Sequence, residues 1–204
     1  MKTKKIIIGE LLVLFLLTMV LVLTNNISTI DETIYQGVIY VRSNLFDFIF
    51  KTITKAGNVI PVLCIVVVSL LCFKNKKDQN MLGVAVVSTV LTNQLLKRII
   101  RRARPSHVRL IEEKGFSFPS GHAMISIALY GFLIYYVYKH VKNKYVKVIL
   151  MTLLLLLIIV IGFSRIYLGV HYPSDVIGGY SLALTILIVV IDWFENHNRG
   201  NKND

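Results

Sequence analysis

The sequence contains few charged residues for its length. Lys, Arg, Asp and Glu together make up 17% of the 204 residues, whereas soluble domains contain about 25%. Cysteine is also scarce: Cys64 and Cys72 are the two in the chain, and both lie in one apolar run. As they would sit about two helical turns apart, they could not easily form a disulfide. A water-soluble domain, a disordered chain, a collagenous chain and a secreted disulfide scaffold are therefore all disfavoured.

Apolar residues make up 55% of the chain and are concentrated in long runs. Six runs approach the roughly 20 residues that a helix needs to cross a bilayer. They are 6–23, 57–73, 81–96, 122–138, 146–163 and 176–194. The sequence therefore predicts an all-α integral membrane protein, a bundle of six transmembrane helices. The first run follows a Lys-rich start and is too long for a cleaved signal peptide, so we expect an uncleaved signal anchor.

Between the first two runs, residues 31–50 place apolar side chains at roughly helical spacing among charged ones. This pattern predicts an interfacial helix that lies on the membrane surface. The alternative is a loop folded against the bundle. Six crossings place both termini on one side of the membrane. Three Lys precede the first run and none follows before Arg42, which favours cytoplasmic termini.

If the chain crosses the membrane in this order, the polar and charged residues that flank the later apolar runs lie together on the extracytoplasmic side. Lys97, Arg101 and Arg104 follow one another at helical spacing, and Pro105 is expected to end their helix. A turn is predicted at 119–122, where Ser120 is a candidate N-cap before Gly121 and His122. Ser164 and Arg165 end the fifth apolar run. His171 and Asp175 flank a helix start at Pro173. Three helix ends are thus predicted to meet at one membrane face.

The residue types in this cluster favour phosphate chemistry. A set of cations would repel a divalent metal ion, so we expect no metal site, although His122, His171 and Asp175 could serve as ligands. Arg and Lys side chains instead suit phosphate oxygens. Asp175 could fix the tautomer of His171 so that its other nitrogen attacks phosphorus, with His122 as general acid. Either histidine taken alone could equally be a packed or interfacial residue.

The same residues resemble the three-part signature of the type 2 phosphatidic acid phosphatase superfamily. Six residues separate Lys97 from Arg104 and Pro105, the turn at 119–122 reads Pro-Ser-Gly-His, and five residues separate Arg165 from His171. The resemblance implies a metal-independent phosphatase without a cofactor that forms a phosphohistidine. It also implies that Lys97, Arg104, Ser120, Gly121 and Arg165 bind phosphate, and that His171, Asp175 and His122 are nucleophile, orienting carboxylate and general acid.

The small size and the apolar runs make the chain most similar to bacterial plasma-membrane lipid phosphatases, with residues 1–204 forming one domain. The expected partner is a phosphorylated lipid, phosphatidylglycerophosphate or undecaprenyl pyrophosphate, and the surrounding membrane lipids. No nucleic acid is expected, since the net charge of +12 comes without a nucleic-acid-binding pattern. A lipid phosphotransferase and a non-enzymatic anion or lipid transporter are the alternatives. The loop residues His107, Arg109, Glu112, Glu113 and Lys114 either select the headgroup or form a solvated loop. The oligomeric state stays open.

Overall fold

The structure is a computed structural model that describes residues 2–106 and 108–200, apart from the side chains of 197–200. All regular secondary structure in these residues is helical, as predicted. The elements are α1 (Lys2–Leu23), α2 (Ser28–Tyr40), α3 (Asn44–Ile53), η1 (Thr54–Gly57), α4 (Val59–Cys72), α5 (Lys76–Ile100), α6 (Gly121–Ser126), η2 (Ile127–Gly131), α7 (Phe132–His140), α8 (Lys144–Tyr167) and α9 (Pro173–Gly200). Since η2 is a π-helical turn between α6 and α7, these three elements form one continuous helical segment.

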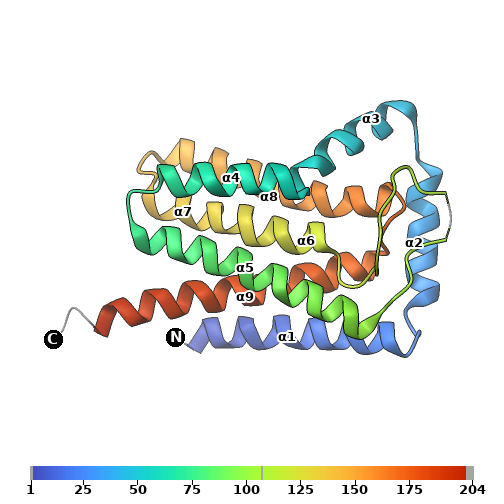
Figure 1. The fold of residues 1–204 in the computed structure, drawn as a ribbon, viewed down its shortest axis with the longest axis horizontal. Coiled ribbons are helices and arrows are strands. Elements are labelled where there is room, and N and C mark those ends of the chain that lie inside the picture. Colours follow the sequence, from blue (N-terminus) through green and yellow to red (C-terminus); the bar gives the residue numbers. More distant parts are fainter. Residues whose placement is uncertain (1, 107, 201–204) are drawn as a thin grey trace.

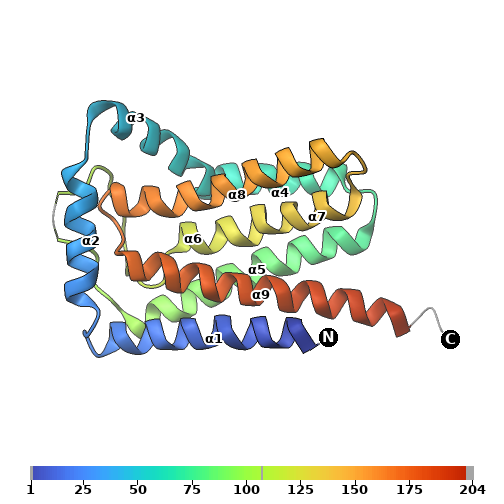
Figure 2. The same cartoon turned by 180° about the vertical axis from the view of Figure 1, so that it is seen from behind.

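The long helices lie side by side along one direction, and α2 crosses one end of the bundle (Figures 1 and 2). Both termini lie toward the other end. The connections between α5 and α6 and between α8 and α9 both fall at the α2 end. The fold therefore brings the three polar segments identified in the sequence to one end of the bundle.

Helix α9 is the most enclosed of the long apolar helices. Of its most apolar stretch, 61% is buried, compared with 11% for α1 and 17% for α8. The outer helices consequently present Leu, Ile and Val side chains outward; Val13 on α1 is 64% exposed and Leu155 on α8 is 50% exposed. Water would disfavour so large an apolar surface, whereas lipid chains accommodate it. The burial pattern is that of a membrane protein.

Four of the predicted spans lie in helices long and apolar enough to cross a membrane: α1, the segment Gly121–His140, α8 and Pro173–Asn196 of α9. The predicted run 57–73 corresponds to α4, which joins the segment Asn44–Gly57 at a bend of 51°. The run 81–96 lies within α5, whose 25 residues are long enough for a crossing but include several polar side chains. Thr89, Asn93 and Gln94 of α5 line a cavity; Thr89 and Asn93 are buried there, whereas Gln94 is also exposed.

The helix predicted over 31–50 is wrong as one continuous element. Helix α2 ends at Tyr40, and Ser43 begins α3 by accepting a hydrogen bond from the Phe46 amide. Between them, Arg42 donates to the carbonyl oxygen of Tyr167 from both Nε (2.9 Å) and Nη2 (2.6 Å). These tertiary hydrogen bonds draw the chain toward α8. Asp31, which the pattern placed among the polar residues of a surface helix, is 1% exposed.

Helices α8 and α9 approach closely where Gly162 faces Tyr180. A Cβ atom added to Gly162 would lie 1.9 Å from the Tyr180 hydroxyl oxygen. That hydroxyl donates a hydrogen bond to the Ile158 carbonyl oxygen on α8. Glycine at 162 is therefore what permits both the close approach and the hydrogen bond.

We expect Gly162→Ala to destabilise the protein by about 1–3 kcal/mol, the usual cost of forcing extra volume into a packed interior. The readout is the melting temperature of the purified protein in detergent. Gly83→Ala on α5 is the matched control, because no atom lies within 4 Å of the Cβ it would add. An unchanged melting temperature for Gly162→Ala would show that Tyr180 moves aside at no cost.

Candidate active site

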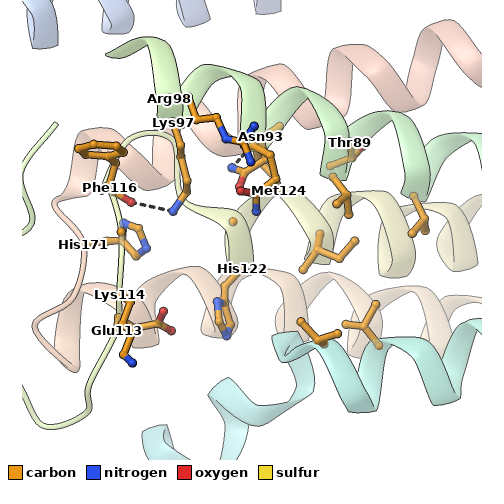
Figure 3. Close-up of a pocket in the computed structure, with 18 of the residues that line it drawn as sticks. Thr89, Asn93, Lys97, Arg98, Glu113, Lys114, Phe116, His122, Met124 and His171 are labelled. Carbon is orange, nitrogen blue, oxygen red and sulfur yellow. Dashed lines mark hydrogen bonds between the residues drawn. The ribbon is translucent and has the colours of Figure 1, made fainter. Parts of the chain in front are cut away.

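The candidate site lies at the α2 end of the bundle, where the loop 101–120, the start of α6 and the α8–α9 connection meet. Figure 3 shows Lys97 of α5, Glu113 of the loop, His122 of α6 and His171 of the α8–α9 connection directed toward one cavity. Of the predicted residues, Lys97, Arg104, Gly121, His122 and His171 line this cavity. The other three, Ser120, Arg165 and Asp175, are buried beside it.

His171 precedes α9 and is 1% exposed. Its Nδ1 atom lies 3.3 Å from Oδ2 of Asp175, and its Nε2 atom lies 3.1 Å from Nη1 of Arg104. A guanidinium group can donate hydrogen bonds but cannot accept them, so Nε2 must be the acceptor. The proton of the neutral ring is then on Nδ1, facing Asp175. The predicted tautomer follows directly from these contacts.

Asp175 is fully buried and receives several hydrogen bonds. Its Oδ2 atom accepts from the Tyr172 amide (2.8 Å) and from the Ser117 hydroxyl. Its Oδ1 atom accepts from Nη1 of Arg102 at 2.7 Å. A carboxylate with both oxygens occupied in this way has a fixed orientation, which in turn fixes the ring of His171.

Arg102 also connects the site to α2. Its Nη2 atom donates to Oδ2 of Asp31 at 2.7 Å, and Asp31 accepts from the Ser174 amide at 2.9 Å. Both ends of the Arg102 guanidinium are bound to carboxylates, so this side chain is not free to bind a phosphate. It positions Asp175 instead.

Burial lowers the pKa of His171 to about 3, and the positive charges of Arg104 and Arg165 act in the same direction. Asp175 opposes this shift without cancelling it. The ring is consequently neutral at pH 7, with its Nε2 lone pair available.

This shift makes the stability of the protein depend on pH. In the unfolded chain His171 has an ordinary pKa of about 6.5 and takes up a proton below it, whereas the folded state resists protonation down to about pH 3. Protonation thus favours the unfolded state, so this contribution to stability falls as the pH drops from 6.5 towards 3. We expect the melting temperature of the wild type to fall more between pH 7 and pH 5 than that of His171→Asn. Equal slopes for the two proteins would contradict the assignment.

His122 stands in the first turn of α6, and Ser120 caps this helix as predicted by accepting from the Ala123 amide. The Nε2 atom of His122 lies 2.8 Å from Oδ1 of Asn58. Gly57 makes room for the ring, since a Cβ atom at that position would lie 2.6 Å from Cδ2 of His122. The short segment between α3 and α4 therefore orients this histidine.

The cations are held mainly by backbone carbonyl oxygens. Lys97 donates to the Phe116 carbonyl at 2.7 Å, and Arg104 donates to the carbonyls of Gly115 (3.0 Å) and Val170 (2.9 Å). Arg165 donates from Nη1 to the Thr54 hydroxyl at 2.7 Å and from Nη2 to the Glu113 carboxylate. Its buried Nε atom has no hydrogen-bond partner among the described residues.

Arg101 does not join this group. Helix α5 ends at Ile100, before the expected stop at Pro105, and Arg101 adopts a left-handed conformation with φ of 53°. Its Nε atom donates back to the Arg98 carbonyl at 2.9 Å. The shared helical face predicted for Lys97, Arg101 and Arg104 therefore ends with Lys97, and Arg104 reaches the site from the loop.

The cavity has a volume of about 620 Å³ and two chemically different parts. One part is formed by the polar site residues. The other is an apolar wall built from α4 and α5, and its side chains are Val59, Val62, Leu63, Val86 and Val90. A ligand with a phosphorylated head and an apolar tail matches this division.

Comparison with known proteins agrees with this geometry. Residues 80–199, more than half of the chain, match the PAP2 superfamily. The chain is 30% identical over 195 residues to phosphatidylglycerophosphatase B of Bacillus subtilis, covering 93% of this chain and 96% of that protein. The chain belongs to the PAP2 superfamily.

Other PAP2 relatives extend this similarity. Decaprenylphosphoryl-5-phosphoribose phosphatase of Mycobacterium tuberculosis is 35% identical over 115 residues, which are 53% of this chain and 56% of that protein. The crystal structure of a transmembrane PAP2-type phosphatidylglycerolphosphate phosphatase from Bacillus subtilis superposes with a TM-score of 0.86 at 28% identity, covering 93% and 96% of the two chains. Aquifex aeolicus LpxE shares the fold, with a TM-score of 0.67 at 22% identity over 78% and 93% of the chains. These relatives support a membrane-embedded phosphatase.

Several residues around this PAP2 site were missed by the sequence interpretation. Asn58, Ser117 and Asp31 all contact the histidines or their supporting groups, and their positions in the sequence give no signal of it. The position of Asn93 did give a signal, because Asn93 precedes Lys97 by four residues and so lies on the same helix face. Asn93 donates a hydrogen bond to the Pro119 carbonyl oxygen at 3.0 Å. Of the proposed headgroup loop, Glu113 and Lys114 line the cavity, Glu112 is exposed, and His107 lies outside the described residues.

Across residues 2–106 and 108–200, no group of three or more His, Cys, Asp or Glu side chains is arranged to hold a metal ion.

Proposed function

We propose that the protein removes the terminal phosphate from a membrane lipid by way of a phosphohistidine on His171. The observation that carries this proposal is the Nε2 lone pair of His171, which is directed at Arg104 at the polar head of an apolar cavity. An anion that draws Arg104 onto its own oxygens releases this lone pair next to its phosphorus atom. Ground-state contact between Arg104 and Nε2 thus keeps the nucleophile covered until a phosphate is bound.

In the first step, Nε2 of His171 attacks phosphorus, the P–N bond forms, and the bond between phosphorus and the lipid oxygen breaks. His122 donates the proton that the departing oxygen needs. In the second step, His122 takes a proton from water, whose oxygen attacks the phosphohistidine and releases inorganic phosphate. Asp175 stabilises the positive ring of His171 between the steps. We assign phosphate binding to Lys97, Arg104 and Arg165, with Ser120 and the Gly121 amide at the helix start.

The apolar wall from α4 and α5 supports a lipid substrate, because the tail can stay in hydrocarbon while the head enters the site. We propose phosphatidylglycerophosphate first, since the Bacillus subtilis relative that matches nearly the whole chain is named for it. Undecaprenyl pyrophosphate is the second candidate. The Mycobacterium tuberculosis relative, whose name specifies a decaprenyl lipid, supports a polyprenyl tail.

We further propose that residues 1–204 form one domain with six crossings, including the bent α3–α4 pair and α5. The termini are then cytoplasmic, and α2 lies at the extracytoplasmic surface beside the site. Single cysteines at Ser106 and Asn143, in a chain with Cys64 and Cys72 replaced by Ser, test this topology. A membrane-impermeant thiol reagent added to intact cells should label position 106 and not 143. The reverse pattern contradicts it.

The reaction is tested by phosphate release from both lipids by the purified protein in detergent, with EDTA present. The cationic surroundings of the cavity lead us to expect release that survives EDTA, because a divalent metal ion would be repelled there. His171→Asn is the control and should release none. Loss of activity in EDTA would contradict the metal-independent mechanism, and transfer of the phosphoryl group to added alcohols would favour a phosphotransferase.

A further inference from the structure

The Glu113 carboxylate occupies the anion-binding part of the cavity. It accepts a hydrogen bond from Nη2 of Arg165, and its Oε2 atom lies 3.8 Å from Nη2 of Arg104. Figure 3 shows this carboxylate directed into the same space as His171 and His122. Two guanidinium groups assigned to the substrate phosphate are thus already holding an anion that belongs to the protein.

The two arginines have few other anionic partners. Arg165 is 1% exposed, its other side-chain hydrogen bond is to the neutral Thr54 hydroxyl, and its Nε atom is unpaired within the described residues. Arg104 is bound mainly by carbonyl oxygens. Glu113 therefore provides the negative charge that these cations would otherwise take from outside. Asp175 is already committed to Arg102 and His171.

A cationic site that opens to a membrane can bind the phosphate of ordinary membrane lipids as well as that of a substrate. Most of the lipid headgroups around it are phosphodiesters, whose phosphate carries one negative charge and offers the same oxygen acceptors as a substrate. Since these lipids are concentrated in the membrane, an empty site with three cations would be filled by them. Hydrogen bonds from Arg104 and Arg165 alone would not distinguish a phosphodiester from a phosphomonoester.

We propose that Glu113 is a specificity-determining residue that excludes phosphodiester lipids by occupying their place; this rests on the lipid phosphatase function proposed above. The carboxylate has the same charge as a phosphodiester, and its attachment to the loop gives it a high effective concentration at the site. A monoanionic diester therefore gains little by displacing it. A phosphomonoester carries about −1.5 to −2 charges at pH 7, and a diphosphate carries more, so both gain additional attraction to the cations.

The test uses Glu113→Gln, which keeps the shape and an oxygen acceptor for Arg165 but removes the charge. Glu112→Gln is the matched control, because the neighbouring residue is exposed and does not line the cavity. Radiolabelled phosphatidylglycerol, a phosphodiester, is bound to each protein in neutral detergent and measured by equilibrium gel filtration. We expect Glu113→Gln to bind it roughly tenfold or more tightly than the wild type, and Glu112→Gln to bind it as the wild type does.

The same change should alter inhibition. Phosphatidylglycerol added to the micelles should slow release of phosphate from a phosphomonoester lipid by Glu113→Gln at about a tenth of the mole fraction that slows the wild type. Inorganic phosphate, measured by calorimetry, should also bind Glu113→Gln more tightly. Unchanged phosphatidylglycerol binding overturns the proposal. Weaker phosphate binding does so as well, because it would mean that Glu113 only holds Arg165 in position.

Glu113→Asp gives a second variant should the glutamine variant fail to fold. It keeps the charge but shortens the reach to Arg165, and the same gain in phosphatidylglycerol binding is expected. The binding measurements do not require turnover, because phosphatidylglycerol is not the proposed substrate. If the wild type releases phosphate from neither lipid, the proposed function fails while the comparison of the variants still decides the role of Glu113.

Discussion

Replacing His171 with Asn will lower kcat for phosphatidylglycerophosphate on the order of 10⁴-fold or more, the scale seen when a nucleophile is removed from a catalytic unit that acts together. Asn keeps a polar group near the position of Nδ1 beside Asp175, and Arg104 is still held by the carbonyl oxygens of Gly115 and Val170, so we expect the proposed phosphate-binding groups to keep their places. What disappears is the nitrogen that attacks phosphorus. The binding of inorganic phosphate should therefore be retained.

The covalent step can be measured directly. Wild-type protein mixed with lipid labelled at the terminal phosphorus and quenched in alkali should carry label, because a P–N bond of phosphohistidine survives base and is hydrolysed in acid. His171→Asn should carry none. His140→Asn is the control for loss of a histidine, since His140 lies at the end of α7 away from the site and pairs with Asp78. Label retained on His171→Asn would place the nucleophile elsewhere.

Replacing His122 with Asn should reduce turnover of lipid substrates about 10²–10⁴-fold, the usual contribution of a general acid. The leaving alkoxide of a lipid needs a proton, and His122 is the residue assigned to give it. A substrate such as p-nitrophenyl phosphate, whose leaving group is stable without a proton, should phosphorylate this variant at a nearly normal rate.

In the proposed mechanism, hydrolysis of the phosphohistidine also needs His122, as the base that activates water. His122→Asn should therefore show a burst of nitrophenolate, equal to the enzyme present, followed by a slow steady state. His140→Asn should behave as the wild type. Equal losses on the lipid and on p-nitrophenyl phosphate, without a burst, would remove His122 from the proton transfers and leave it a binding residue.

Much of the fold could be predicted because its signals are local. Apolar runs locate the helices, Pro173 begins α9, and Ser120 caps α6, each as expected from residues within one or two turns. Helix α5 was harder, since Asn93 and Thr89 interrupt its apolar run. These two side chains line the cavity, which forms only when α4 packs opposite α5.

The candidate site was predictable in its residue types and less so in its pairings. Charge indicates that Arg102, Arg104 and Arg165 each need an anion, but it cannot show which one. The structure gives Arg102 two buried carboxylates, from α2 and α9, and leaves Arg104 and Arg165 for the cavity. Asn58 and Glu113 contact residues more than fifty positions away. Such contacts are a property of the assembled bundle and have no local signature.

The pair of carboxylates around Arg102 also bears on how the protein is made. Asp31 emerges from the ribosome early, Arg102 midway, and Asp175 with its neighbour Ser174 close to the end. The hydrogen bonds that hold Asp175 are therefore complete only after the last helix has been synthesised and inserted. A partly translated chain that ends before residue 171 holds Lys97 and Arg104 without His171, so it lacks the proposed nucleophile until synthesis is nearly finished.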